Sequence, residues 1–192
     1  MEFFDLVHRR RSVRKYQKRQ IPRQALERIL EAGSCAPNAG GGQRTMLVGI
    51  QNVSLLEKLG RLNAGAMDRS RLAGTYVSHD QPSLIDDPTI KSGFYGAPTV
   101  IAIFSPEQFL YAVPDAFCCA ENMVLAATEL GIASCIVARG EETFHHPYGL
   151  TLMEEWGVPE GWMARCFVLM GYCEGDYPSP KERRPGRVKI ID

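Results

Sequence analysis

The spacing of apolar residues divides the chain into helical and extended segments. Leu26, Ile29 and Leu30 follow Pro22 at three- and four-residue steps, which predicts a helix over 22–33. Similar spacing predicts helices over 2–9, 54–63, 114–130 and 151–156, and short apolar runs predict strands over 45–50, 99–104, 133–138, 164–171 and 188–191. The pattern contains no repeat and no internal boundary, so we expect a single α+β domain over residues 1–192.

Three segments differ in composition from their surroundings. Residues 34–44 include a run of four small residues, Ala39 to Gly42, which predicts a loop. Residues 64–95 mix Gly, Ser, Asp and Pro with short apolar pieces, and long connections of this kind are often functional lids. The segment 114–130 is small or apolar on almost every side, which predicts burial in the core or in a subunit interface.

Composition excludes several classes of protein. The chain has 192 residues, 45% of them apolar and 23% charged, which is typical of globular proteins and not of disordered or collagen-like chains. The 22 basic and 22 acidic residues balance, which argues against a general nucleic-acid binder. No apolar run approaches the roughly 18–20 residues of a membrane span. The first residues lack the features of a secretory signal, so we expect a cytoplasmic protein.

The cysteines and histidines do not form a recognisable metal motif. Without a secretory signal we expect the six cysteines to be reduced and mostly buried. There is no Cys-x-x-Cys, and the adjacent His145 and His146 cannot point the same way from a regular element. We therefore expect no metal site. A Cys–His pair using Cys35 or Cys135 is a weak alternative, and no Gly-x-Ser-x-Gly motif indicates a hydrolase.

Basic residues gather near both ends of the chain. Residues 9–15 read RRRSVRK, and a second cluster contains Lys181, Arg183, Arg184 and Arg187. By itself the first cluster favours a solvated basic helix end over a site that grips a phosphate monoester. Two such clusters in a neutral protein would repel each other unless an anion lies between them, so together they support the phosphate site as well as the helix end.

The glycine-containing loop Asn38–Gln43 suggests close contact between backbone and ligand. It follows a predicted helix and precedes a predicted strand, which is the reverse of the order in a dinucleotide-binding fingerprint. No P-loop pattern occurs either. Together with the basic clusters, the loop suggests a mononucleotide or a flavin.

Four ordered segments resemble the FMN-dependent nitroreductase family: RRRSVRKY, APNAGGGQR, GAPTVIAIF followed by DAFCCAENMVLAATELGIASCIV, and GYCEGDYPSPKERRP. They extend over nearly the whole chain. The resemblance implies a central mixed or antiparallel sheet flanked by helices. It also implies a homodimer in which residues 188–191 are exchanged as a strand and the two active sites are shared between protomers.

The resemblance also assigns roles by position. Arg10 and Ser12, with Arg11 beside them, would bind the FMN phosphate, and Lys181 and Arg183 would complete that grip. Arg14 would reach the N1/O2 edge of the ring. The remaining candidates are Pro37, Asn38 and Ala39 from the partner subunit, Gln43 and Asn63 near the ring, and Ser134, Cys135 and Ile136 along it near N5.

The implied reaction is a ping-pong transfer from NADH or NADPH to a small oxidised organic acceptor, such as a nitroaromatic or a quinone. The chemistry belongs to the flavin, so no catalytic side chain is expected. Gly41 and Arg44-Thr45 depart from the family's usual Asn and Pro-Trp, which alters the pocket beside the loop. The alternatives are ene reduction, dehalogenation or flavin breakdown on the same fold, and a non-catalytic module that binds an anion or RNA.

Overall fold

Four apolar segments form one antiparallel sheet in the computed structural model, which describes residues 1–68, 70 and 76–192. The strands are β1 (Met46–Ile50), β2 (Thr99–Pro106), β3 (Ala133–Val137) and β4 (Trp162–Gly171). They lie in the order β1-β2-β4-β3, and each neighbouring pair is antiparallel. The central strands β2 and β4 are buried on both faces, which explains their continuous apolar sequences.

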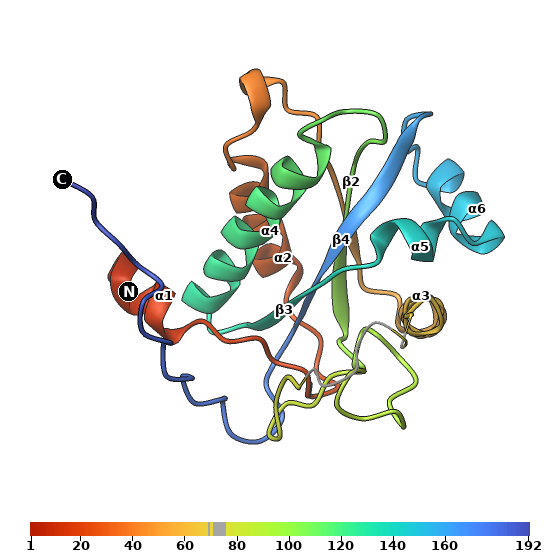
Figure 1. The fold of residues 1–192 in the computed structure, drawn as a ribbon. Helices are drawn as coiled ribbons and strands as arrows, with labels where there is room; N and C mark the ends of the chain where they lie inside the picture. Colours follow the sequence, from red (N-terminus) through yellow and green to blue (C-terminus); the bar gives the residue numbers. More distant parts are fainter. Residues whose placement is uncertain (69, 71–75) are drawn as a thin grey trace.

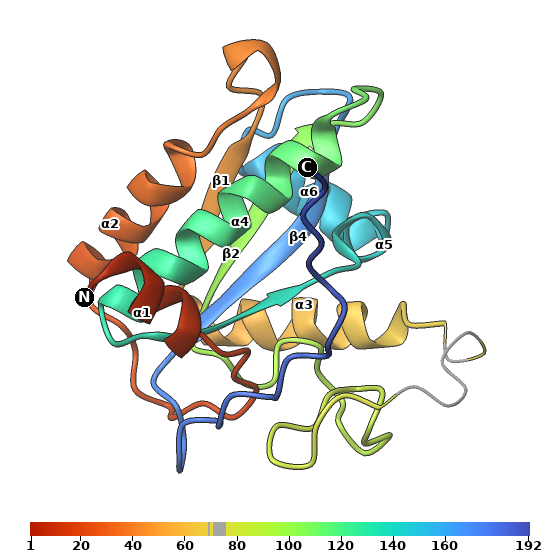
Figure 2. The same cartoon turned by 60° about the vertical axis from the view of Figure 1, so that its left-hand side comes forward.

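Helices cover both faces of this sheet (Figure 1). Helices α2 (Arg23–Ser34) and α4 (Ala112–Glu129) pack on one face, and α3 (Val53–Gly65), α5 (Gly140–Phe144) and α6 (Pro147–Glu155) pack on the other. The turned view in Figure 2 shows α4 lying across the sheet while α3 runs along its lower edge. The predicted α+β class and helix-flanked sheet are confirmed.

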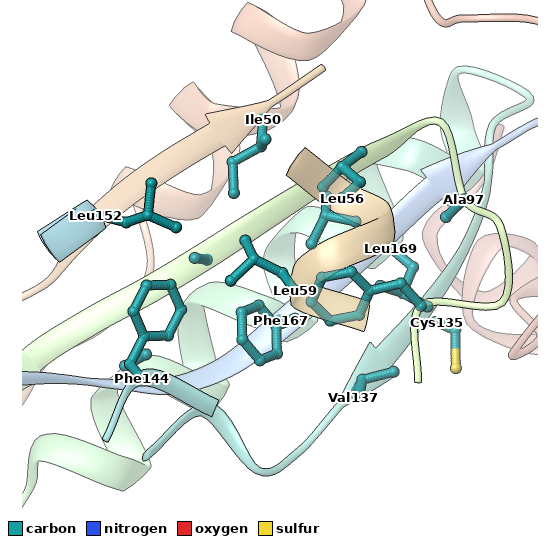
Figure 3. Packing of buried hydrophobic residues seen from close by; sticks show 14 of the residues in the cluster. Ile50, Leu56, Leu59, Ala97, Cys135, Val137, Phe144, Leu152, Phe167 and Leu169 are labelled. Atoms are coloured by element: carbon teal, nitrogen blue, oxygen red, sulfur yellow. The ribbon is translucent and has the colours of Figure 1, made fainter. Parts of the chain in front are cut away.

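Alternation along β2 divides the core into two clusters. Val100, Ala102 and Phe104 face α3, α5 and α6, whereas Ile101 and Ile103 face α2 and α4. Figure 3 shows the first cluster, in which Phe144 from α5 lies beside Phe167 from β4. The ring centroids of these two residues are 6.0 Å apart. Both faces of the sheet are therefore closed, and a ligand must bind at an edge or an end of it.

Several details differ from the sequence prediction. Helix α4 buries its inner face in the core and exposes Val113, Phe117 and Cys118 on its outer face, so the predicted burial is not complete within one chain. Helix α5 was not predicted, and α6 begins at Pro147 instead of Thr151. Residues 188–191 form no strand within this chain and are exposed. Of the six cysteines, which form no disulfide, Cys119, Cys135 and Cys166 are buried.

The N-terminal segment is attached to the far edge of the sheet. Helix α1 (Phe3–Arg9) has no buried residue, and the chain after it runs alongside β3. Ser12 forms a parallel bridge with Ser134, and Tyr16 forms an antiparallel bridge with Cys173. These bridges place the first basic cluster at the edge formed by β3. Within the described residues, no helix combines the length and the hydropathy needed to cross a bilayer.

Candidate functional site

Basic residues from both ends of the chain line one cavity of about 260 Å³. The N-terminal segment contributes Arg10, Arg11, Ser12 and Arg14, and the C-terminal tail contributes Lys181 and Arg183. Residues 77, 78, 80 and 81 line its remaining wall. We call this space the cationic cavity. The structure thus brings together all six candidates that the sequence assigned to phosphate and to the N1/O2 edge.

Backbone contacts hold the two terminal segments in place. The Val13 N–H donates to the Ser134 carbonyl at 2.9 Å, and the Val13 side chain is fully buried. The Arg11 N–H donates to the Tyr177 hydroxyl at 3.1 Å, which attaches the tail to the basic segment. The β3 edge and Tyr177 therefore hold the two basic segments close to each other.

The charges in this cavity lack acidic partners. The ion pairs that the structure records in its described residues involve the N-terminus, Arg23 and Arg165, and none involves a cation of the cavity. Asp80 lines the cavity without forming an ion pair. Burial lowers the pKa of Arg11, and the neighbouring Arg183 and Arg10 lower it further. Such an arrangement favours a bound anion.

Two buried polar atoms beside this cavity also lack a partner. They are the Nε of Arg11 and the Oγ of Ser134, and they are unpaired among the described residues. The Nη1 of Arg11 is already used, because it donates to the carbonyls of His8 and Arg10 at 2.6 Å each. Buried donors without partners are costly, so they indicate that a polar ligand completes the site.

A loop over residues 77–86 lies against the same cavity. The Arg14 N–H donates to Gln81 Oε1 at 2.5 Å, and the Lys181 ammonium donates to the Val77 carbonyl. The loop is organised by Asp86, whose carboxylate accepts from the N–H groups of Val77 at 2.6 Å and Ser83 at 2.8 Å. Part of the predicted 64–95 connection therefore forms a wall of the site, while residues 69 and 71–75 lie outside the described residues.

A second cavity of about 140 Å³ adjoins the first, and Arg14 lines both. Cys135, Ile136, Tyr95 and Arg139 are among its walls. Burial raises the pKa of Cys135 and outweighs the opposite effect of Arg14. The thiol donates to the Ile136 carbonyl at 3.5 Å. Cys135 is therefore a protonated packing residue in this structure and not a thiolate.

Asn63 lies behind the wall of the second cavity and is not among the residues that line it. Its side chain is fully buried, and its Nδ2 donates to the Ala138 carbonyl at 3.0 Å and to Thr143 Oγ1 at 3.1 Å. Its Oδ1 accepts from Nη2 of Arg139 at 2.8 Å. Asn63 thus contacts the second cavity through Arg139.

The loop with Pro37, Asn38, Ala39 and Gln43 lines neither cavity of its own chain. Figure 1 shows it in orange at the other end of the sheet from the basic segment. The Ala39 N–H donates to the buried Asp115 carboxylate at 3.0 Å, and the Gln43 N–H donates to Asn38 Oδ1 at 2.8 Å. The loop is therefore ordered by its own contacts.

The sequence reasoning missed four residues that shape the site: Gln81, Asp86, Arg139 and Tyr177. Gln81 and Asp86 lie in an irregular segment where no periodicity indicates which side chains turn inward. Arg139 follows a strand in a left-handed conformation, with φ of 65°. Tyr177 is the residue that the sequence indicates most clearly, since it is an aromatic residue among prolines and charges in the tail segment GYCEGDYPSPKERRP.

Comparison with known proteins shows similarity to one enzyme family over most of the chain. A sequence model described as the nitroreductase family matches residues 7–172. The crystal structure of a nitroreductase with bound FMN from Bacteroides fragilis is 31% identical, with both chains fully covered and a TM-score of 0.82.

Two archaeal relatives are provisionally assigned as an NADH dehydrogenase or NAD(P)H nitroreductase. The protein from Archaeoglobus fulgidus is 27% identical over 97% of this chain and 96% of its own length. The protein from Methanothermobacter thermautotrophicus is 28% identical over 70% of this chain, and the match spans 59% of that relative.

We predict that Asp86→Ala loosens the 77–86 loop at neutral pH. The substitution removes hydrogen bonds to a charged acceptor, each worth about 1.5–3 kcal/mol, so the Val77 and Ser83 amides should exchange hydrogen about ten- to a hundredfold faster. Asp87→Ala is the matched control, because among the described residues the Asp87 carboxylate accepts only from Thr89. Equal exchange rates in the wild-type protein and Asp86→Ala would contradict this role.

The same loop should respond to acid. Burial alone would raise the pKa of Asp86, but the hydrogen bonds from Ser83, Val77 and Ser78 together lower it. The stabilisation is therefore complete above the ordinary carboxyl value of about 3.9 and is lost as pH falls through the lower folded value.

Proposed function

The chain belongs to the nitroreductase family, and from this premise we propose that it is an FMN-dependent oxidoreductase using NADH or NADPH to reduce a small organic acceptor. The observation that carries the proposal is the cationic cavity, where side chains from both ends of the chain meet and form no ion pair with a described residue. A phosphate monoester carries about −1.5 to −2 charges near neutral pH and presents three strong acceptor oxygens. That is the chemistry this donor set fits.

The residues divide into a phosphate grip and a ring edge. Arg10, Ser12, Lys181 and Arg183 would hold the phosphate, and the unpaired Nε of Arg11 offers a further donor. Arg14 lies where the two cavities join, so its charge would act on the ring rather than on the phosphate. The unpaired Ser134 hydroxyl, together with Cys135 and Ile136, would complete the edge along β3.

When bound, the flavin supplies the hydride and electron transfer that these side chains cannot perform. The contribution of the chain is orientation and charge. Arg14 stabilises negative charge at the edge of the second cavity, and its own position is fixed by Gln81. The 77–86 loop forms one wall of the cationic cavity. NAD(P)H and the acceptor would use the remaining opening in turn, which gives ping-pong kinetics.

We also propose that the protein is a homodimer with shared sites. Phe3, Phe4 and Val7 on α1 are exposed, as are Val113 and Phe117 on α4, and single chains seldom expose so many large apolar residues together. Residues 188–191 are equally exposed and free to add to a partner's sheet. In the dimer, Pro37, Asn38, Ala39 and Gln43 of one protomer would cover the flavin of the other.

The purified protein tests the proposal directly. We expect a yellow solution that yields FMN on denaturation and loses its visible flavin absorbance when NADH or NADPH is added without oxygen. An acceptor screen after that reduction separates nitroaromatic and quinone reduction from the other flavin reactions. A colourless protein that is retained on nucleic acid with a steep salt dependence would contradict the proposal.

Arg10→Ala tests the phosphate grip. Removing one charge-assisted bond of about 1.5–3 kcal/mol should weaken FMN binding about ten- to a hundredfold, measured by titrating the apoprotein with flavin. Arg9→Ala is the matched control, since Arg9 is exposed and does not line the cationic cavity. Unchanged affinity in Arg10→Ala, or equal losses in both variants, would contradict the assignment.

Phe117→Glu tests the dimer. Placing a charge on the exposed face of α4 should convert the dimer to a monomer in light scattering and reduce the flavin retained through purification. Val53→Glu alters an exposed apolar residue on α3, outside the proposed interface, and should do neither. A wild-type protein that is monomeric with full flavin content would overturn the shared-site arrangement.

A further inference from the structure

The second cavity has an unusual wall. Three non-glycine residues of the described chain adopt a left-handed backbone, and two of them, Tyr95 with φ of 52° and Arg139 with φ of 65°, line this cavity. A left-handed conformation is unfavourable for a residue with a Cβ. Strain of this kind persists where the surrounding structure enforces it, often at functional sites. Arg139 is therefore held in place at some cost.

Asn63 fixes one edge of the Arg139 guanidinium. The Nε of Arg139 donates to the Asn63 carbonyl at 3.1 Å, and its Nη2 donates to Asn63 Oδ1 at 2.8 Å. Asn63 is itself fully buried and bonded to Thr143. The Nη1 of Arg139 has no partner among the described residues, and it is not among the buried atoms that lack one. One nitrogen of a firmly positioned cation thus remains accessible.

Among the described residues that line it, the cavity presents positive charge and no carboxylate. Arg14 and Arg139 are the charged residues of this described lining. Burial lowers the pKa of Arg139, and the charge of nearby Glu142 opposes this effect without forming an ion pair in the described residues. Arginine stays protonated in proteins, so a bound anion would relieve part of the cost of this half-buried charge.

Most of the remaining wall is apolar, with Ser83 as a polar exception. Val77, Ile85, Ile136 and Val137 line the cavity beside the ring of Tyr95. The Arg14 guanidinium lies 6.0 Å from the centre of that ring. A ligand that suits this wall has a flat apolar body and one negative group.

We propose that Arg139 is a specificity-determining residue that binds the carboxylate of the electron acceptor, so that the acceptors of this enzyme are aromatic or quinoid acids. The inference rests on the proposed function, because it places the flavin ring along Arg14, Cys135 and Ile136 and the acceptor on the Arg139 side of the same cavity. It identifies the substrate class through a residue that the phosphate grip does not use.

Equilibrium binding to the oxidised, flavin-loaded protein tests this without turnover. Benzoate and benzamide have nearly the same shape and differ in charge. We expect calorimetry to show benzoate binding about tenfold or more tightly than benzamide. Arg139→Asn should remove that preference, because asparagine tolerates the left-handed backbone and carries no charge. Arg139→Lys should keep part of it.

The matched control is Arg61→Gln, which removes one positive charge from the exposed side of α3. Arg61 is not among the residues that line the cationic cavity or the second cavity. The substitution should leave the preference for benzoate unchanged. The FMN content of each variant confirms that its fold is intact.

Turnover gives the second measurement. In the oxidative half-reaction, the reduced protein should prefer para-nitrobenzoate to para-nitrobenzamide in the wild type, and this preference should fall about tenfold in Arg139→Asn. Equal binding and equal rates for both members of each pair, in a flavin-loaded wild type, would overturn the acceptor assignment alone. A protein that carries no flavin would contradict the proposed function and the acceptor assignment with it.

Discussion

Repulsion between like charges is the constraint on which the site depends. Arg10, Arg11, Arg14, Lys181 and Arg183 line one cavity, and none has an ion-pair partner in the described residues. Two unit charges 4 Å apart repel by about 1 kcal/mol in water and by about 4 kcal/mol near a protein surface. A bound dianion reverses the sign of these interactions. The fold keeps the charges together through the Ser12–Ser134 bridge and the Tyr177 hydroxyl, neither of which is itself charged.

The same geometry is consistent with the proposal that two protomers share each flavin site. The closed faces of the sheet leave the β3 edge for the ligand, and the cationic cavity and the second cavity meet there at Arg14. The Asn38–Gln43 loop, anchored by Asp115, is ordered but lies at the other end of the sheet. A second protomer would bring an equivalent loop to the open side. Flavin binding and dimer formation are therefore expected to depend on each other.

Features that depend on apolar periodicity or on composition could be predicted from the sequence. The strands, α2, α3 and α4 follow from apolar spacing, and two separated basic clusters in a neutral chain predicted a shared anion. The sequence could not predict α5, which has only five residues, or the way Gln81 and Asp86 turn toward the site from an irregular loop. Arg139 was not predicted because a left-handed arginine leaves no trace in the sequence pattern. Nothing in the sequence indicates that Asn63, which is expected near the ring, also holds Arg139 through its Oδ1.

A double-mutant cycle of Arg10→Ala and Arg183→Ala, titrated with FMN and with riboflavin, tests most directly whether both termini grip one phosphate. The account predicts that each substitution weakens FMN binding, that the two losses are not additive, and that riboflavin, which lacks the phosphate, binds all four proteins alike. Additive losses, or equal losses for FMN and riboflavin, would show that the two arginines do not share a phosphate and would contradict the account.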